Sequence, residues 1–290
     1  MSGILENGKV EKIENVSAKH AEETLSQKEL SQLEIAQSEI RYRNVKQLQV
    51  RHLNFAYPDG KQILKDISFK AEKGETIAVI GSTGSGKSTL VNLIPRFYDV
   101  TEGRVLVDGV DVRDMTQKDV RDRLGYVPQK GVLFSGTIDS NIRYGKTDIS
   151  EEKVKEAAKV AQAAEFIETK PERYDSPIAQ GGTNVSGGQK QRLSIARAIA
   201  KKPEIFIFDD SFSALDFKTD STLRKALKTH TKDATTIIVA QRISTILNAD
   251  KIIVLDDGHM AGIGSHKELM ENCEVYRQIA MSQLSEEELA

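Results

Sequence analysis

The stretch that most constrains this chain runs from Gly81 to Ser88 and reads Gly-Ser-Thr-Gly-Ser-Gly-Lys-Ser. An apolar run typical of a strand, Thr76 to Ile80, precedes it, and a run typical of a helix, Leu90 to Ile94, follows it. Its three glycines let the backbone curl so that several N–H groups point inward, beside the positive end of the following helix. A flexible Gly/Ser linker, the alternative interpretation, would need neither the strand nor the helix. We therefore predict a phosphate-binding loop.

The side chains at the end of this loop suggest what it holds. The Lys87 ammonium can reach the outer phosphates, and the Ser88 hydroxyl can ligate Mg²⁺. Asp209 follows the apolar run Ile205 to Phe208, so its carboxylate can join Ser88 in holding Mg²⁺. An aspartate after a strand is by itself as often a turn residue, but the loop makes it a candidate ligand. The predicted phosphate contacts are Gly81, Ser82, Thr83, Gly84, Ser85, Gly86, Lys87, Ser88 and Thr89.

Composition excludes several classes of protein. The chain has 290 residues, 39% hydrophobic and 29% charged, as an ordinary globular protein does. Its formal net charge of -2 gives no reason to expect nucleic-acid binding. Its one cysteine, Cys273, cannot form an internal disulfide and fits a reducing compartment. No apolar run approaches the ~18 residues that span a bilayer, and Met1 to Val10 lacks an apolar secretion signal. We expect a cytosolic protein that forms no membrane channel itself.

Three parts can be distinguished along the chain. Residues 1–46 are polar, with weakly periodic apolar positions that favour a surface helix across Glu22 to Arg41 or a partly ordered extension. Residues 47–284 are predicted to form one domain, and residues 285–290 a short tail. Alternating apolar positions over Gln47 to Phe55 predict a strand with one irregularity. Two further strands, Ile63 to Phe69 and Thr76 to Ile80, are joined by a short turn, and these early strands predict an antiparallel sheet beside the phosphate-loop core. Gly103 to Val110 predicts a strand that runs into a tight turn.

Helices and buried strands alternate in the rest of the domain. Residues Glu151 to Phe166 carry alanine and valine at helical spacing, which predicts a helix-rich insertion. Shorter helices are predicted over Val120 to Leu124 and Lys190 to Ala200, and a capping box at Ser265 to Glu268 begins a C-terminal helix. Continuous apolar runs predict parallel strands over Ile205 to Phe208, Thr235 to Ala240 and Ile252 to Leu255.

A second motif carries a resemblance to a known family. Residues Ser186, Gly187, Gly188 and Gln189, with the helix after them, are similar to the signature of the ATP-binding cassette (ABC) ATPases, although Val185 replaces the usual leucine. With the phosphate loop and Asp209 in the family's order, the resemblance covers about residues 47–284. It implies an α/β fold: a P-loop NTPase (RecA-like) core with an antiparallel β-subdomain and a helical subdomain. It also implies that ATP and Mg²⁺ are the cofactors.

The resemblance assigns roles to other positions. Tyr57 matches the aromatic residue that stacks on adenine, and the less favoured alternative is a packing residue of the β-subdomain. Gln129 matches the glutamine that touches the metal and the attacking water. The signature residues Ser186 to Gln189 act on ATP held by the opposite subunit. Residues 131–145 look like the region that faces the membrane domains of multidrug-type exporters, and residues 213–216 match the loop that crosses the dimer interface.

Two candidate catalytic residues depart from the family pattern. The general base after the metal aspartate is usually glutamate, but here it is Asp210, whose carboxylate falls short by more than ~1 Å. The switch position is usually histidine, but here it is Gln241, which can donate a hydrogen bond yet carries no proton or positive charge. Both changes weaken hydrolysis and leave the nucleotide cradle intact.

This combination resembles the degenerate half of heterodimeric ABC exporters, in which a good signature completes the partner's site. We therefore expect a multidrug or lipid exporter's ATPase domain at the cytoplasmic side of the cell membrane. Its expected partners are a second ABC ATPase domain and transmembrane domains, and no nucleic acid. An ordinary homodimer that tolerates both changes is the alternative pairing. A nucleotide-gated clamp with negligible turnover is the alternative function. A soluble ABC ATPase of DNA repair or translation would usually carry two cassettes or a coiled-coil insertion.

Overall fold

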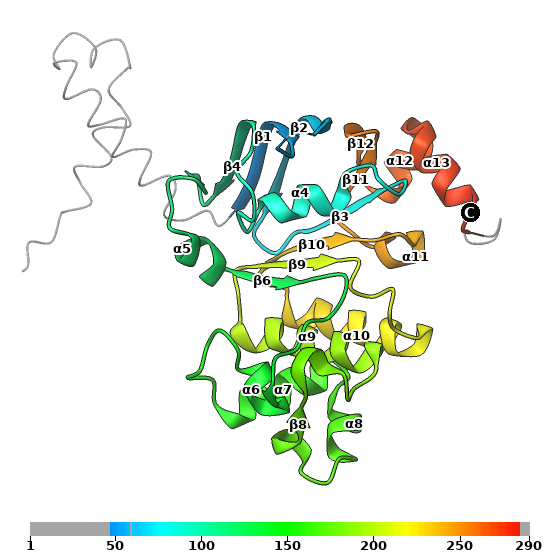
Figure 1. Ribbon diagram of the computed structural model, residues 1–290. Helices are drawn as coiled ribbons and strands as arrows, with labels where there is room; N and C mark the ends of the chain where they lie inside the picture. The colour runs from blue at the N-terminus through cyan, green and yellow to red at the C-terminus, as the bar shows by residue number, and fades with distance from the viewer. Residues whose placement is uncertain (1–46, 59, 285–290) are drawn as a thin grey trace, which may run out of the picture. The chain divides into compact units, whose positions relative to one another are not determined.

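The computed structural model describes residues 47–58 and 60–284 (Figure 1). The predicted helix across Glu22 to Arg41, the rest of the extension and the tail lie outside the described residues. No helix within the described ranges is both long enough and apolar enough to cross a bilayer.

The predicted antiparallel sheet is present, and its strands lie in the order β2-β1-β4-β5. The early strand Thr76–Gly81 belongs instead to the six-stranded sheet. Along β1 the buried residues change frame, from Leu48 and Val50 to Leu53 and Phe55. A register shift between Val50 and Leu53 inserts the extra residue, and His52 takes a positive φ of 46° there. The predicted irregularity is therefore a β-bulge that keeps all four side chains in one core. The strands are β1 (Gln47–Ala56), β2 (Gln62–Glu72), β4 (Glu102–Val107) and β5 (Val110–Asp111).

A six-stranded sheet forms the centre of the domain, in the order β12-β11-β3-β10-β9-β6. All neighbouring pairs are parallel except β11 and β12, which form a hairpin. Parallel pairing brings the carboxyl ends of β3, β10, β9 and β6 to one edge, where open α/β sheets bind their ligands. The strands are β3 (Thr76–Gly81), β6 (Leu124–Val127), β9 (Ile205–Asp209), β10 (Thr235–Val239), β11 (Lys251–Asp256) and β12 (His259–Gly264).

Both faces of this sheet are covered, which is why β9 is buried along its whole length. One face of β9, with Ile205 and Ile207, packs in the same core as the helix α4 (Lys87–Leu93) and the antiparallel sheet. Its other face, with Phe206 and Phe208, packs against the helical part of the domain, which lies below the sheet in Figure 1. The helices α11 (Ile243–Ile246), α12 (His266–Asn272) and α13 (Glu274–Met281) cover the other end of that second face, over β3 and β11.

The helical part lies between β6 and β10 in the sequence. Its longest helix, α9, begins at the cap Ser186, and Lys202 ends it in the left-handed conformation. Its elements are α6 (Ile138–Ile142), α7 (Glu151–Val160), α8 (Ala164–Glu168), α9 (Gly187–Lys201), α10 (Phe217–His230), the 3-10 turns Arg173–Asp175 and Gln180–Gly182, and the small ladder of β7 (Gly136–Thr137) and β8 (Pro177–Ile178). Besides α11, α12 and α13, the helices α4 (Lys87–Leu93) and α5 (Gln117–Asp122) lie outside it.

Two sequence predictions of helices need correction. The helix predicted over Val120 to Leu124 ends at Asp122, because the Arg123 carbonyl accepts hydrogen bonds from the N–H groups of Glu204 and Ile205 and draws the chain beside β9. Leu124 accordingly begins a strand. The helix-rich insertion is present, but the run from Glu151 to Phe166 is two helices, because Gln162 takes a positive φ of 56°. The predicted capping box at Ser265 is confirmed.

Candidate functional site

The loop between β3 and α4 requires glycine at two points. A Cβ on Gly81 would lie 2.0 Å from the carbonyl oxygen of Leu255 on the neighbouring strand β11. Gly86 is the N-cap of α4 at a φ of 99°, and a Cβ there would lie 2.7 Å from the Leu64 side chain. Any larger residue would push the loop away from the sheet edge. The loop is therefore held tightly against the carboxyl ends of the strands.

Two side chains of the loop have an arrangement that suits an anion. The Lys87 Nζ donates hydrogen bonds to the carbonyls of Gly81 and Ser82, at 2.8 and 2.7 Å. Burial lowers the pKa of Lys87, and the nearby carboxylates of Asp210 and Asp209 partly offset that effect. The Ser85 hydroxyl is buried and has no hydrogen-bond partner within the described residues. A buried, unpaired hydroxyl beside a partly desolvated ammonium is a good environment for phosphate oxygens.

The predicted metal ligands Ser88 and Asp209 lie together. Ser88 Oγ donates to Asp209 Oδ1 at 2.8 Å, and Asp209 is only 5% exposed. Burial raises the pKa of Asp209, whereas the hydrogen bonds from Ser88 and Tyr126 lower it by less. The Tyr126 hydroxyl lies 3.4 Å from Asp209 Oδ2 and donates to Asn92 Oδ1 at 2.9 Å. One hydroxyl and one carboxylate oxygen are the hard ligands that Mg²⁺ prefers.

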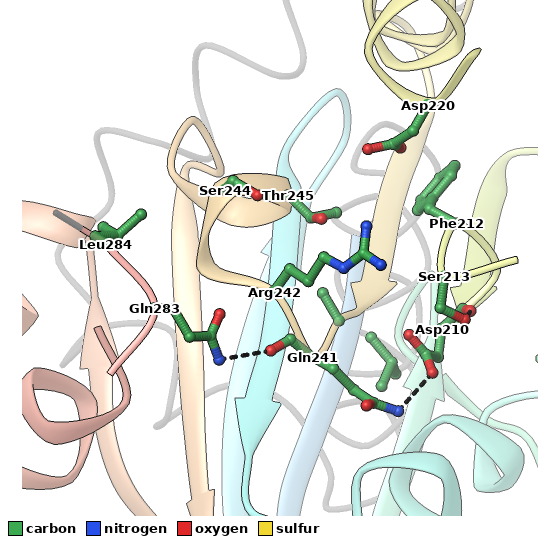
Figure 2. A pocket seen from close by; sticks show the side chains of 12 residues that line it. Asp210, Phe212, Ser213, Asp220, Gln241, Arg242, Ser244, Thr245, Gln283 and Leu284 are labelled. Carbon is green, nitrogen blue, oxygen red and sulfur yellow. Dashed lines mark hydrogen bonds between the residues drawn. The ribbon is translucent and has the colours of Figure 1, made fainter. Parts of the chain in front are cut away.

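The two residues that depart from the family pattern also lie together. Gln241 Nε2 donates to Asp210 Oδ2 at 2.7 Å (Figure 2), and Gln129 Nε2 donates to the same oxygen at 3.0 Å. Asp210 has a positive φ of 46°, and its N–H donates to the carbonyl of Val239 on β10. The structure thus gathers the ends of β6, β9 and β10 on one carboxylate. Gln129, predicted as a metal contact, bonds Asp210.

A cavity of about 440 Å³ lies beside Asp210 and Gln241 (Figure 2). Ser213, at the start of the predicted interface loop, lines it and donates its hydroxyl to the carbonyl of Asp210 at 2.9 Å. The last residue of that loop, Asp216, caps α10 by accepting from the N–H of Thr219. Arg242 and Gln283 also line the cavity. The interface loop is therefore attached directly to the backbone of the candidate base.

Tyr57 lies in an aromatic cluster at the end of β1. Its ring meets Phe55 edge-on at 4.9 Å between centroids and Tyr98 at 5.1 Å. Its hydroxyl lies 3.3 Å from Thr89 Oγ1, so the cluster is tied to the helix of the phosphate loop. The ring is half-buried, with a surface that is both packed and accessible. Both interpretations of Tyr57, adenine platform and packing residue, fit this position.

The predicted signature residues form the start of α9. Ser186 Oγ accepts from the N–H of Gln189 at 3.2 Å, and Gln189 Oε1 accepts from the N–H of Ser186 at 3.0 Å. This capping box fixes the first turn, and a Cβ on Gly188 would lie 3.5 Å from the carbonyl of Ala214 in the interface loop. Gly187 has open space around its Cα. The signature is thus a rigid, accessible helix start, separate from the chain's own phosphate loop.

Sequence reasoning missed three residues that support the site. Tyr126 and Asn92 form the hydrogen-bonded layer behind Asp209, and Gln283 bonds the backbone of Gln241. Tyr126 lies three residues before Gln129, in the segment Tyr-Val-Pro-Gln, and a tyrosine so close to a predicted metal contact could have indicated it. Asn92 and Gln283 carry no local signal, because their partners lie far away in the sequence.

Comparison with known proteins adds to this geometry. The sequence profile described as ABC transporter matches residues 64–213. Two similar proteins from Staphylococcus aureus are named for multidrug export as ATP-binding/permease proteins. The protein of strain bovine RF122 / ET3-1 is 47% identical to this chain over 233 residues, and that of strain NCTC 8325 / PS 47 is 46% identical over 233 residues. Each match covers 80% of this chain and 40% of the relative. The chain therefore spans about two fifths of the length of these curated relatives.

A solved structure is similar across most of the chain. It is described as a bacterial Atm1-family ABC exporter with ATP bound, and it is 40% identical in sequence with a TM-score of 0.80. The match covers 84% of this chain and 42% of that one. At 40% identity the two chains are similar in sequence as well as in fold. The predicted fold class, a P-loop core with an antiparallel β-subdomain and a helical part, is confirmed.

Proposed function

The chain belongs to the ABC transporter family, and from this premise we propose that it is the ATP-binding and hydrolysing motor domain of an exporter of multidrug or lipid-like substrates. It pairs with a second ABC ATPase domain at the cytoplasmic side of the cell membrane, and closure of the pair drives transmembrane domains. The observation that carries the proposal is the meeting of Lys87, Ser88 and Asp209 at the carboxyl ends of β3 and β9.

The residues present fit ATP and Mg²⁺. The loop amides of residues 81–86, the Lys87 ammonium and the unpaired Ser85 hydroxyl would hold the phosphates. Ser88 and Asp209 would hold Mg²⁺, which when bound neutralises charge on the phosphates. Tyr57 would stack on the adenine. The signature residues Ser186 to Gln189 would serve the partner's nucleotide, because they lie on a separate accessible helix start.

Asp210 and Gln241 would orient the attacking water and the outer phosphate, but weakly. The Asp210 side chain is one methylene shorter than glutamate, and its Oδ2 already accepts two amide hydrogen bonds. An oxygen that is so occupied has little capacity left to take a proton from water. Gln129 and Gln241 therefore hold the candidate base in a resting position, and we propose that this chain hydrolyses ATP slowly at its own site.

Calorimetry with Mg·ATP tests the nucleotide site. We expect binding by the full chain and at least tenfold weaker binding by Lys87→Ala, because one charge-assisted contact contributes about 1.5–3 kcal/mol. Lys73→Ala, at an exposed lysine in the turn before β3, is the matched control and should bind as the parent does. The absence of heat on mixing the parent chain with Mg·ATP, or full binding by Lys87→Ala, would contradict the proposal.

A nucleotide-gated clamp without meaningful turnover is the second candidate. It is favoured by the same double hydrogen bond on Asp210, which leaves the base poorly available. Single-turnover hydrolysis by the purified chain separates the two functions. A measurable rate that Lys87→Ala abolishes supports the slow ATPase, whereas tight binding with no hydrolysis supports the clamp.

A further inference from the structure

The side chain of Gln283 grips the backbone of the loop that carries Gln241 (Figure 2). Its Nε2 donates to the carbonyl oxygen of Gln241 at 2.9 Å, and its Oε1 accepts from the N–H of Ile243 at 2.8 Å. One planar amide thus satisfies an acceptor and a donor two residues apart, as a neighbouring β-strand would. Two hydrogen bonds from one rigid group fix both the distance and the direction of the loop.

The contact supplies the helix cap that the loop itself lacks. Helix α11 begins at Ile243, and its N-cap Arg242 makes no side-chain capping bond within the described residues. The Oε1 of Gln283 accepts the N–H of the first helical residue in its place. Gln241 is therefore held from two sides, through its carbonyl by Gln283 and through its side chain by Asp210 at 2.7 Å.

The element that presents Gln283 is itself well anchored. Tyr276 of α13 is fully buried, and its hydroxyl lies 2.7 Å from Nδ1 of His266 on α12. Ala280 is buried as well, and its carbonyl accepts from the N–H groups of Gln283 and Leu284 just after the helix. The amide of Gln283 is thereby set in place by the core over β3 and β11.

From this geometry we infer that Gln283 is a positioning residue for the switch position: the end of α13 holds Gln241 so that its amide meets Asp210. We call the two hydrogen bonds of Gln283 to the backbone of Gln241 and Ile243 the clasp. The effect of the clasp on ATP hydrolysis rests on the proposed function, whereas the clasp itself does not. Loss of the clasp would free the Gln241 backbone at the point where α11 starts. While both hydrogen bonds are intact, a displacement of α13 would reach the hydrolytic residues through this one side chain.

Amide hydrogen exchange, followed by NMR, tests the clasp directly. In the full chain, Gln283→Ala should speed exchange at the Ile243 N–H by about five- to tenfold, as expected for one lost hydrogen bond. Gln278→Ala is the matched control, since this exposed amide, on α13 itself, bonds only Glu274 among the described side chains. Gln283→Glu keeps the acceptor and should keep most of the protection. Unchanged exchange in Gln283→Ala would overturn the inference.

Single-turnover ATP hydrolysis tests the consequence. Gln283→Ala should slow the rate about threefold to tenfold while the Mg·ATP affinity stays as in the parent, because the phosphate loop is untouched. In a Gln241→Ala background the same substitution should have no further effect on the rate. Additive losses would show that Gln283 does not act through Gln241. If the parent hydrolyses no ATP, the proposed function fails, and the exchange experiment still decides the clasp.

Discussion

The Oδ2 atom of Asp210 accepts hydrogen bonds from two glutamine amides, of which Gln129 follows β6 and Gln241 follows β10. These bonds hold the amides of Gln129 and Gln241 on the same carboxylate oxygen. They also occupy an oxygen that a general base would use to accept a proton from water. The positive φ of 46° at this residue is a conformation that aspartate adopts more readily than most residues. A longer acid here would have to displace one of the two amides.

Asp210→Glu should raise single-turnover hydrolysis by about ten- to a hundredfold, because the added methylene corrects a reach of about 1 Å. The rate is measured by quenched flow at saturating Mg·ATP, with and without a partner domain. Asp210→Asn is the control, since it keeps the size and loses the base, and it should lower the rate further. If Asp210→Glu leaves the rate unchanged in both settings, side-chain length is not the cause of slow hydrolysis.

Asp209 provides a prediction about pH. Burial raises its folded-state pKa above the ordinary value of 3.8, so the ionised form destabilises the nucleotide-free fold. This penalty is absent below the unfolded pKa, grows as pH rises through the folded pKa, and is constant above it. Asp209→Asn should therefore stabilise the nucleotide-free chain at pH 7, and the gain should shrink at pH 4. Urea midpoints at the two pH values measure it.

Asp216 gives the control of opposite sign for this measurement. Hydrogen bonding at the start of α10 lowers its pKa, so its charge stabilises the fold above the unfolded pKa and that stabilisation is lost as pH falls. Asp216→Asn should accordingly cost stability at pH 7 and less at low pH. Equal effects of Asp209→Asn at both pH values would show that its buried charge does not matter.

At the scale of elements, Arg197 joins α9 to the segment that precedes and forms α6. Its guanidinium donates to the carbonyls of Asn141 and Val132 and to Asn141 Oδ1, at 2.8, 2.9 and 3.0 Å. It also lies over the stacked rings of Phe134 and Tyr144. Burial lowers the pKa of Arg197 to about 10. The helix that begins with the signature is thus tied to the region predicted to face membrane domains.

Arg197→Ala should destabilise the chain by about 2–4 kcal/mol, because it removes the charged donor of three hydrogen bonds, two of them partly buried. Arg197→Lys should recover only part of this loss, since an ammonium cannot reproduce the guanidinium fork. Urea unfolding measures both, with Arg104→Ala on the exposed side of β4 as the control. A loss below about 0.5 kcal/mol for Arg197→Ala, the range of ordinary surface changes, would contradict this role.

Elements with a strong local pattern were predictable, and those set by distant contacts were not. The strand Ile205 to Phe208 is apolar without interruption, and Ser265 with Glu268 forms a complete capping box, so both elements can be predicted from the local sequence. Helix α10 (Phe217–His230) was not predicted, because its buried residues Asp220, Leu223 and Leu227 form a sparse stripe. The junction at Leu124 depends on hydrogen bonds to Glu204 and Ile205, eighty residues away. In the site, the phosphate loop and Asp209 could be predicted from the sequence, whereas the hydrogen-bonded layer of Tyr126 and Asn92 behind Asp209 could not.

At the scale of the whole molecule, the chain holds a phosphate loop, for which we propose slow hydrolysis, and a signature that caps its own helix. ABC ATPase domains share nucleotide between two copies, so the signature can serve a different loop. The proposed heterodimer uses the good half of this chain to complete a site on another. A homodimer would instead combine this signature with the same chain's own loop, at which we propose slow hydrolysis.

A mixing experiment distinguishes the two arrangements. The double variant Asp210→Glu, Gln241→His carries the family's usual residues at both positions and serves as a stand-in partner. The Lys87→Ala variant, which keeps Asp210 and Gln241 and should bind ATP poorly, is added to it. This addition should stimulate hydrolysis by the double variant severalfold. Ser186→Arg in the added chain should abolish the stimulation, because it blocks the signature. Equal stimulation by both added chains would count against pairing through Ser186.

The burial of Cys273 has a practical consequence for observing such pairs. It is the only cysteine in the 290 residues and is 5% exposed, at the junction of α12 and α13. Thiol reagents should leave it largely unlabelled in the folded chain. A cysteine introduced at an exposed position such as Lys218 would then carry a spin label alone. Electron paramagnetic resonance could follow the opening and closing of two labelled chains without first removing a native thiol.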